Sequence, residues 1–240
     1  MLIPSLLKHL LCIALILVSN GALFGASVQL STFDTFSGAE TLAIPDGNYS
    51  GAVDIRTISF GSPGSVISSI RVGLNISGDF NGDLYGYLSY GTEMSVLLNR
   101  PGLSASNSDG YFDSGLDIML SEGAPSGIHS YQATTTPAVG APLTGEWIPD
   151  GRNIHPESSG ASFDAATRNA GLDSFNGLAA DGDWSLFLAD ISSGGEVNLE
   201  SWSLEITVVP ESKSYALICG LFLVVLSAWR RITRKVDSHA

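Results

Sequence analysis

A strict alternation of apolar and polar residues runs through Ser201-Trp202-Ser203-Leu204-Glu205-Ile206-Thr207-Val208. In an extended chain the apolar side chains of such a stretch all point to one side, so the pattern predicts a strand with one buried face. Residues 69–76 alternate in the same way, with Ile70, Val72, Leu74 and Ile76 on the apolar side. These two segments make β structure the expected fold class.

Shorter strands are expected at residues 84–90, 94–98 and 184–188, because clusters of Gly, Asn, Asp and Ser that favour turns separate them. Residues 133–142 and 153–162 are expected to be long loops. Several short strands with frequent turns are typical of an antiparallel β-sandwich. We therefore predict a single all-β, antiparallel sandwich domain over residues 27–208.

The charge of this body restricts its partners. Between residues 27 and 209 five arginines and no lysine face 22 acidic residues, a formal charge of −17. Such a field repels nucleic acid and anionic lipid surfaces, and it favours cations or basic partners. Both cysteines, Cys12 and Cys219, lie in apolar end segments, so the body has no disulfide and its stability must come from a core.

The amino terminus has the layout of a secretory signal peptide. Lys8 and His9 precede the apolar residues 10–18, and small residues follow at 21–27. We expect residues 1–26 to form the signal peptide, with cleavage near residues 25–27. A retained helix is the alternative, although the apolar run is short for a membrane span.

The carboxyl terminus is expected to be a membrane anchor. Residues 215–229 carry no charge, and at ~1.5 Å per residue a helix of that length falls slightly short of the ~30 Å bilayer core. The basic residues that follow would remain cytoplasmic, which places the body outside the cytoplasm; they are Arg230, Arg231, Arg234 and Lys235. A buried carboxy-terminal core helix is the alternative.

Residues 209–235 also resemble a known protein-sorting signal. The polar motif Val209-Pro210-Glu211, the apolar segment and the basic tip together resemble the sorting signal of bacterial PEP-CTERM proteins. Ser212 departs from that pattern, in which a second proline is usual. The resemblance implies processing by an exosortase-like membrane enzyme, and a location at the cell envelope, on the cell surface or outside the cell, with membrane anchoring at least transiently.

The body resembles the P/Homo B domain family. Several motifs within residues 44–208 occur in the same order as in this family. These motifs are Ile70-Arg71-Val72-Gly73-Leu74-Asn75-Ile76, Gly82-Asp83-Leu84-Tyr85-Gly86-Tyr87-Leu88, Phe175-Asn176-Gly177, Gly182-Asp183-Trp184-Ser185-Leu186-Phe187-Leu188-Ala189-Asp190 and Leu199-Glu200-Ser201-Trp202-Ser203-Leu204. The resemblance implies a jelly-roll β-sandwich. Such domains accompany subtilisin-like convertases, and they also occur alone on secreted bacterial proteins.

Catalysis by the body itself is not expected. In this family the P domain stabilises a catalytic domain and supplies no nucleophile, and no catalytic domain is expected ahead of residue 44. The body contains His129 and His155, both expected to be exposed loop residues, and no G-x-S-x-G nucleophile elbow. A Ser-His-Asp site stays open as an alternative, because triads assemble in space.

Calcium is the cofactor that the sequence indicates. Asp79, Asn81 and Asp83 alternate in a turn, where oxygen ligands can converge on a hard cation. An EF-hand is excluded, because its sixth and twelfth positions hold Leu84 and Tyr90. A site of another kind would add further carboxylates, and the candidates are Asp113, Asp117, Asp181 and Asp183. The alternative is that these residues simply stabilise turns.

Aromatic residues suggest a saccharide-binding face. Tyr85 and Tyr87 share one side of a strand, Tyr90 points to the other, and Trp147 is a further candidate. Packing within the sandwich is the alternative use of the same side chains. From these features we predict a non-enzymatic binding or structural module of the cell surface or extracellular matrix, with exopolysaccharide as a candidate partner. The alternative is an accessory P domain that acts with a separate serine protease.

Overall fold

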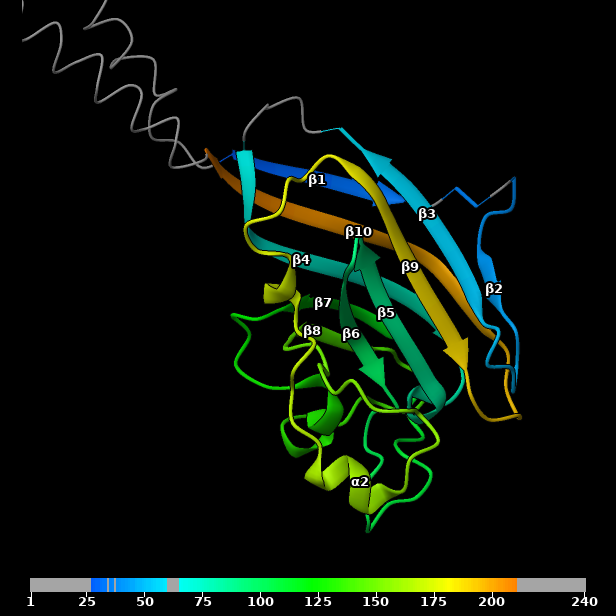
Figure 1. Ribbon diagram of the computed structural model, residues 1–240. Helices are drawn as coiled ribbons and strands as arrows, with labels where there is room; N and C mark the ends of the chain where they lie inside the picture. The colour runs from blue at the N-terminus through cyan, green and yellow to red at the C-terminus, as the bar shows by residue number, and fades with distance from the viewer. Residues whose placement is uncertain (1–26, 34, 37, 60–64, 211–240) are drawn as a thin grey trace, which may run out of the picture.

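A computed structural model describes residues 27–33, 35–36, 38–59 and 65–210. Two packed β-sheets form this part of the chain, with short helices in the connections (Figure 1). Its elements are β1 (Ser27–Phe33), β2 (Leu42–Ile44), β3 (Ala52–Ile58), β4 (Ser65–Gly78), η1 (Asn81–Asp83), β5 (Leu84–Tyr90), β6 (Glu93–Asn99), β7 (Leu116–Ser121), η2 (Ile128–Ala133), β8 (Leu143–Trp147), α2 (Gly160–Ala165), η3 (Leu172–Phe175), β9 (Gly182–Asp190) and β10 (Val197–Pro210).

The large sheet has six strands in the order β1-β10-β4-β7-β8, with β2 paired to β10, and the small sheet has four in the order β3-β9-β5-β6. The expected all-β sandwich is therefore confirmed. The prediction that all neighbouring strands pair antiparallel was wrong for one pair, because β7 and β8 run parallel. The long connection between these two strands, which carries η2, allows the chain to return in the same direction.

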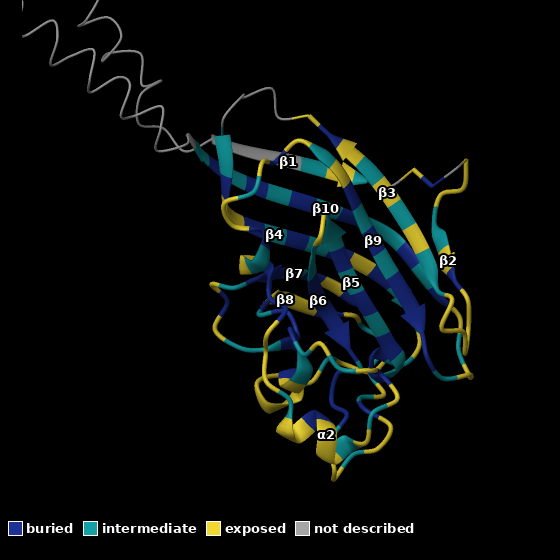
Figure 2. Cartoon of the chain, in the orientation of Figure 1, coloured by how far each residue is buried: buried dark blue, intermediate teal, exposed yellow. Residues whose placement is uncertain are grey.

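The core lies between the sheets, as the burial colours of Figure 2 show. Trp202 and Leu204 of β10 face Trp184, Leu186 and Leu188 of β9, and all five are at most 1% exposed. Complete burial of a large apolar side chain contributes about 1.5–3 kcal/mol, so these side chains are a main source of stability. The alternation that predicted strands at residues 69–76 and 201–208 thus points its apolar side into this core.

The connections depart from expectation in one segment. Residues 134–142 form a loop without regular structure, as expected. The loop expected at residues 153–162 instead runs into α2, whose first turn is capped by Ser159, because its side chain accepts a hydrogen bond from the Ser162 N–H. A helix of only six residues shows no amphipathic period, so the sequence pattern could not reveal it.

Several sequence-based predictions fall on the ends of the chain. The signal peptide at residues 1–26, the helix expected at 215–229 and the basic tip lie outside the described residues, as does Glu211. Val209 and Pro210 are described, and they extend β10 two residues past the expected domain boundary by pairing with Val66 and Ser65. Across the described segments, no helix is long and apolar enough to cross a membrane.

Candidate binding surface

The edge strand β3 has its apolar side turned outward. Val53 and Ile55 are 50% and 61% exposed, although they are the largest apolar residues of the strand apart from Ile58. Between them Asp54 points into the sandwich, where its carboxylate accepts a 2.7 Å hydrogen bond from the indole N–H of Trp202. The usual arrangement of apolar residues inside and polar residues outside is inverted here.

An internal ion pair satisfies the charges that this inversion buries. The Arg56 Nε donates to Asp54 at 2.7 Å, and the same guanidinium donates to the carbonyl of Thr35 at 2.7 Å. The guanidinium also lies 5.4 Å and 5.7 Å from the ring centres of Phe33 and Phe36. Paired and covered in this way, Asp54 and Arg56 can occupy the inner side of β3 at a tolerable desolvation cost.

The outward side chains of β3 continue into a row of aromatic rings. In the sheet register Val53 lies beside Phe187 of β9, and Phe187 lies beside Tyr87 of β5. The rings of Phe187 and Tyr87 stack at 4.8 Å and 17°, and the Tyr85 ring lies 6.0 Å from Tyr87 and 6.1 Å from Phe187. We call the surface formed by Val53, Ile55, Tyr85, Tyr87 and Phe187 the aromatic face.

Polar groups border the aromatic face on one side. The next row of the sheet places Ile55 beside Ser185, and Ser185 beside Ser89. One row further, the Thr57 hydroxyl donates to the exposed Asp183 carboxylate at 2.5 Å. A ligand on the aromatic face would therefore meet hydroxyl and carboxylate groups at its margin.

The Tyr85 hydroxyl of this face remains uncharged at neutral pH. Burial raises the pKa of Tyr85 above its ordinary value of 10.0, and the neighbouring Tyr87 raises it further. A neutral phenol both donates and accepts hydrogen bonds. The face thus combines flat apolar rings with neutral polar tips, a combination suited to ligands that have both apolar and hydroxyl-bearing sides.

Of the four aromatic residues considered for saccharide binding, Tyr90 and Trp147 do not belong to this face, and Tyr90 was expected to point to the other side of its strand. Tyr90 stacks on the core residue Trp184 at 4.3 Å and 12°, on the inner side of the small sheet. Trp147 is only 4% exposed, and its indole N–H donates to the Thr144 carbonyl. Phe187 was missed, although it alternates in the sequence with Trp184, Leu186 and Leu188, a pattern that places it on the opposite side of the strand.

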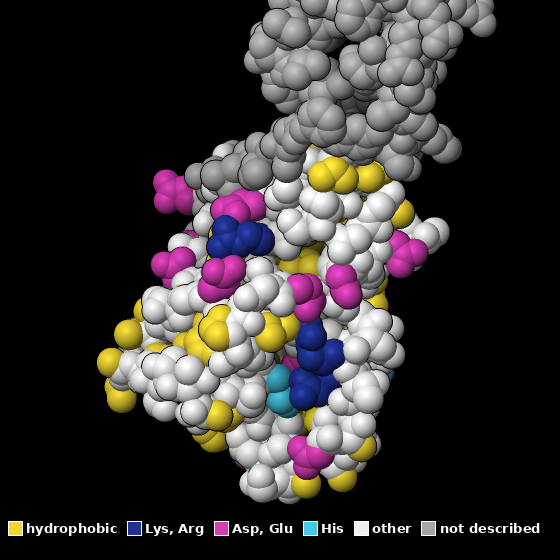
Figure 3. All heavy atoms as spheres, turned by 90° about the vertical axis from the view of Figure 1, so that its left-hand side faces the viewer, with side chains coloured by type: hydrophobic (Ala, Val, Ile, Leu, Met, Phe, Trp, Pro, Cys, Tyr) yellow, Lys and Arg dark blue, Asp and Glu magenta, His cyan; other side chains and the backbone are white. Residues whose placement is uncertain are grey.

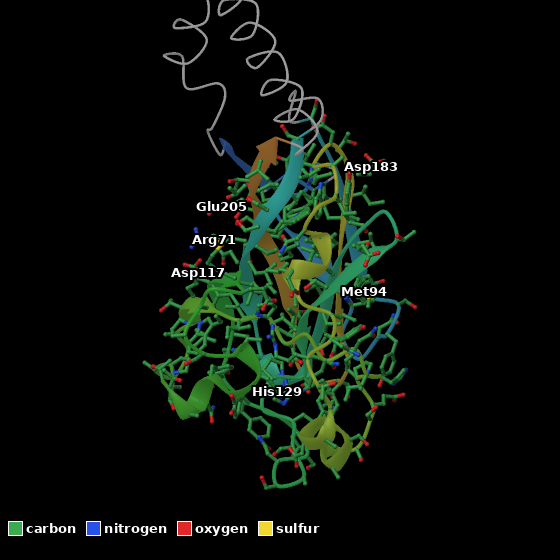
Figure 4. All side chains as sticks on the ribbon, turned by 60° about the vertical axis from the view of Figure 1, so that its left-hand side comes forward. Arg71, Met94, Asp117, His129, Asp183 and Glu205 are labelled. Atoms are coloured by element: carbon green, nitrogen blue, oxygen red, sulfur yellow. The ribbon has the colours of Figure 1, made fainter. Side chains whose placement is uncertain are left out.

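The outer surface of the large sheet has the opposite character. Arg71 of β4 forms ion pairs with Glu205 of β10 and, at 3.2 Å, with Glu146 of β8. Figure 4 labels Arg71 between Glu205 and Asp117 on this side of the molecule, and Figure 3 shows basic and acidic side chains interspersed on the surface. We call this surface the polar face.

A shallow depression of about 360 Å³ lies in the polar face, on the outer side of β4, β7, β8 and β10. Several small residues line it, among them Gly73 and Ser203, and a side chain at Gly73 would collide with the Ser203 hydroxyl. Asn75 and Asp117 line it with polar groups. Trp202 also lines it, but this residue is only 1% exposed, so its ring is not available for stacking with a ligand.

Two of the predicted calcium ligands are brought together. The Asn81 amide donates to the Tyr131 hydroxyl at 3.2 Å, and that hydroxyl donates to the Asp113 carboxylate at 2.8 Å. The Asp113 carbonyl also accepts from the Asn81 N–H at 2.8 Å. Tyr131 therefore stands between the two side chains, and its pKa is raised mainly by burial.

The other predicted ligands are distributed around the sandwich. Asp83 pairs with Arg100 at 3.3 Å, Asp79 is exposed, and the Asp181 carbonyl accepts from the Tyr90 hydroxyl at 2.7 Å. Figure 4 shows Asp117 and Asp183 on opposite sides of the molecule. The seven residues thus do not converge on one site, and no three His, Cys, Asp or Glu side chains within the described ranges are arranged to hold a metal ion.

The two histidines differ in their surroundings. His155 is 67% exposed, as expected, but His129 is only 13% exposed and the expectation was wrong for it. The Nδ1 of His129 lies 2.6 Å from Asp150, and its Nε2 lies 3.0 Å from the Leu103 carbonyl. Because both ring nitrogens have partners, neither is placed to accept a proton from a serine.

Comparisons with known proteins show only limited similarity to this chain. No protein-family model matches the chain, and no curated protein matches it. Among solved structures, the chain is similar to the serine protease of Aeromonas sobria, with 17% identity and a TM-score of 0.40, and to the complex of that protease with the chaperone ORF2, with 17% identity and a TM-score of 0.39. Each alignment covers 81% of this chain and 29% of the other, so the chain spans less than a third of those proteins.

Proposed function

We propose that this protein is a non-enzymatic binding module of the cell surface or extracellular matrix, and that its aromatic face binds exopolysaccharide. The inversion of β3 is the observation that carries the proposal. The strand exposes Val53 and Ile55, while the half-buried ion pair of Asp54 and Arg56 lies on its other side, next to Trp202. Contiguous exposed apolar surface of this kind marks a contact site.

The chemistry of the face favours a sugar polymer as its ligand. Aromatic rings such as Tyr87 and Phe187 can pack against the apolar sides of sugar rings, and the hydroxyl and carboxylate groups at the margin can bond sugar hydroxyls. The body carries a formal charge of −17, which repels anionic polymers. A neutral or cationic polysaccharide is therefore the expected ligand class.

Export and sorting belong to the same proposal. The signal-peptide pattern at residues 1–26 and the PEP-CTERM-like tail at 209–235 support delivery to the envelope by an exosortase-like enzyme. Intact mass of the protein recovered from its native cells tests this part. A mass that ends near Pro210 indicates a processed tail, whereas a chain that still starts at residue 1 contradicts signal cleavage.

Affinity electrophoresis of the purified chain through gels that contain neutral, cationic or anionic polysaccharide tests the binding function. Retardation by a neutral or cationic polymer, lost in Tyr87→Ala, is the expected result. Met119→Ala is the matched control, because Met119 lines the depression in the polar face. Equal retardation of both variants, or no retardation by any polymer, refutes the proposed site.

An accessory role beside a separate serine protease is the second candidate function. The order of the motifs at residues 82–88, 182–190 and 199–204, which resembles a P/Homo B domain, favours it. In that role the chain would prolong the activity of a protease from the same cells and hydrolyse nothing alone. Casein and chromogenic peptides distinguish the cases: hydrolysis by the purified chain that Ser→Ala scanning abolishes would contradict both non-enzymatic candidates.

A further inference from the structure

The connection between β2 and β3 carries the tripeptide Asn48-Tyr49-Ser50. Asparagine followed two positions later by serine or threonine is the acceptor pattern for N-linked glycosylation, a modification of surface loops in secreted proteins. Residues 75–77 are the other tripeptide of this pattern in the sequence. Because so short a pattern also occurs by chance, the surroundings of each asparagine decide whether it can be modified.

Asn75 lies inside the large sheet. Its strand β4 pairs with β10 on one side and with β7 on the other, where Asn75 lies opposite Ser201 and Asp117. A transferase has to take the acceptor segment into its own active site, and this segment could leave the sheet only by breaking two rows of backbone hydrogen bonds. Asn75 is therefore blocked in the folded protein, although its side chain is exposed.

Asn48 lies outside the strands, in a segment where residues 45–50 are all exposed to solvent. The nitrogen that would carry the sugar is Nδ2, and it donates no hydrogen bond to any of the residues that the structure describes. The Oδ1 of the same carboxamide accepts a 2.9 Å hydrogen bond from the Ser50 N–H. The acceptor group thus lies beside the residue whose hydroxyl the pattern requires, and both face the solvent.

Few contacts attach this loop to the body. The Asn48 N–H donates to the Asp190 carbonyl at 2.8 Å, and Asp46 accepts from the Gly194 N–H at 3.0 Å. The Tyr49 ring, itself 42% exposed, packs against an exposed histidine at 6.2 Å between ring centres. None of these contacts belongs to a strand pairing, so the loop can enter an enzyme without opening either sheet.

We propose that Asn48 is an N-glycosylation site and that a polyprenyl-diphosphate-linked oligosaccharide is the sugar donor. The Asn48 Nδ2 forms a bond to the anomeric carbon of the first sugar, and the bond between that carbon and the diphosphate oxygen breaks. The polyprenyl diphosphate leaves, and one Nδ2 proton passes to a base of the transferase. Because this pattern is used in secreted proteins, the inference rests on the export that is part of the proposed function.

A glycan on Asn48 would stand at the margin of the aromatic face. The loop enters β3 through Gly51, which lies so close to Phe187 that a side chain added there would approach the ring to 2.7 Å. The polar margin formed by Thr57 and Asp183 lies at the other end of β3. The glycan would therefore place sugar hydroxyls at the second end of this face.

Peptide mapping by mass spectrometry, on denatured protein recovered from its native cells, tests the proposal. Denaturation removes any polysaccharide that is bound without a covalent link. Trypsin cleaves after Arg56 and Arg71, so the two candidate asparagines fall in separate peptides. The peptide that ends at Arg56 is expected to carry a glycan on Asn48, and the peptide that begins after Arg71 is expected to carry none on Asn75.

Variants of the acceptor pattern sharpen the test. Asn48→Gln and Ser50→Ala are expected to abolish the modification, whereas Ser50→Thr is expected to keep it, because threonine also supplies the hydroxyl. Asn75→Gln is the matched control and should leave the glycan unchanged. All three positions are exposed, so these substitutions are expected to leave the fold intact.

An unmodified Asn48 in the wild-type protein would overturn the proposal, as would a glycan on the same peptide in Asn48→Gln. Equal modification of Asn75 would also overturn it, because exposure outside the strands would then not select the site. The intact mass of the same sample distinguishes this failure from a failure of export. A chain without residues 1–26 and without sugar contradicts glycosylation alone, whereas an unmodified chain that starts at residue 1 contradicts export as well.

Discussion

The two outer surfaces of the sandwich are built from the same strand alternation but present different chemistry. The polar face is crossed by ion pairs centred on Arg71, and Ser77 donates a hydrogen bond to Glu200 near one end of it. The aromatic face exposes Val53 and Ile55 beside stacked rings. Nothing about a sheet requires an apolar outer side, so the contrast supports the proposed ligand contact at the small sheet.

The contrast is sharpest within β3 itself. A simple exchange of sides would bury Val53 and Ile55 and expose Asp54 and Arg56, which burial energies alone would favour. The structure keeps the reverse arrangement and satisfies the inner charges with Trp202 and the Thr35 carbonyl. The hydrogen bonds to the charged side chains therefore stabilise the orientation of β3 in which its apolar side is exposed.

Removal of the central rings should have the largest effect on function. The double variant Tyr87→Ala/Phe187→Ala is expected to lose at least tenfold in polysaccharide affinity, since a few aromatic side chains usually carry most of the energy of a contact surface. Titration calorimetry with the polymer identified by affinity electrophoresis measures the loss. Met119→Ala should bind as wild type does, and an equal loss in both proteins would show that the contrast between the faces has no functional meaning.

Removal of the internal carboxylate should have the largest effect on stability. Asp54→Ala leaves the Trp202 indole N–H and the Arg56 Nε without their acceptor, and we expect the free energy of unfolding to fall by about 1–3 kcal/mol. Denaturation in urea measures the change. Thr57→Ala on the outer side of the same strand is the control, with an expected change within about 0.5 kcal/mol; similar costs in the two variants would mean that Asp54 does not hold β3 in its inverted position.

The ion pairs of the polar face should contribute less. Arg71→Met is expected to lower the free energy of unfolding by at most about 1 kcal/mol, because Arg71 and Glu146 are both well exposed to solvent. The difference should shrink as salt is added, and polysaccharide binding should not change. A loss of binding in this variant would assign part of the ligand site to the polar face.

A charge placed at the margin of the aromatic face should barely affect folding. Ile55 is 61% exposed, so Ile55→Lys is expected to change the free energy of unfolding by no more than about 0.5 kcal/mol. The same variant should weaken polysaccharide binding several-fold. A stability loss of several kcal/mol would indicate that Ile55 is covered in the native protein and that the face is not free.

The fold could be predicted from the sequence wherever alternation was strict. The segments around Ile70 and Trp202 became the long central strands β4 and β10, because a period of two in apolar residues has few other structural solutions. The parallel pairing of β7 and β8 and the helix α2 could not be predicted. Pairing direction depends on the path of the connection, and six residues are too few for a helical period.

The residues of the candidate sites were likewise only partly predictable from the sequence. Tyr85 and Tyr87 were assigned to one side of a strand by their spacing, and Phe187 could have been added by the same rule. The acidic residues were a harder case, because Asp, Asn and Gly abound in turns and their spacing does not say which of them meet. The glycosylation pattern occurs at Asn48 and at Asn75, and only the strand pairing shows that Asn75 lies between β10 and β7.

By itself the sequence predicted an all-β sandwich over residues 27–208, long strands where apolar and polar residues alternate at 69–76 and 201–208, and a strongly acidic body. It did not predict β3. Only the tertiary structure decided which side of β3 faces the core and which of the two glycosylation patterns lies outside a paired strand. Alternation fixes the relative direction of neighbouring side chains, but it is symmetric between inside and outside. That symmetry is broken by Trp202, whose indole N–H donates to Asp54 from the core, and Val53 and Ile55 on the opposite side of β3 are exposed to the solvent.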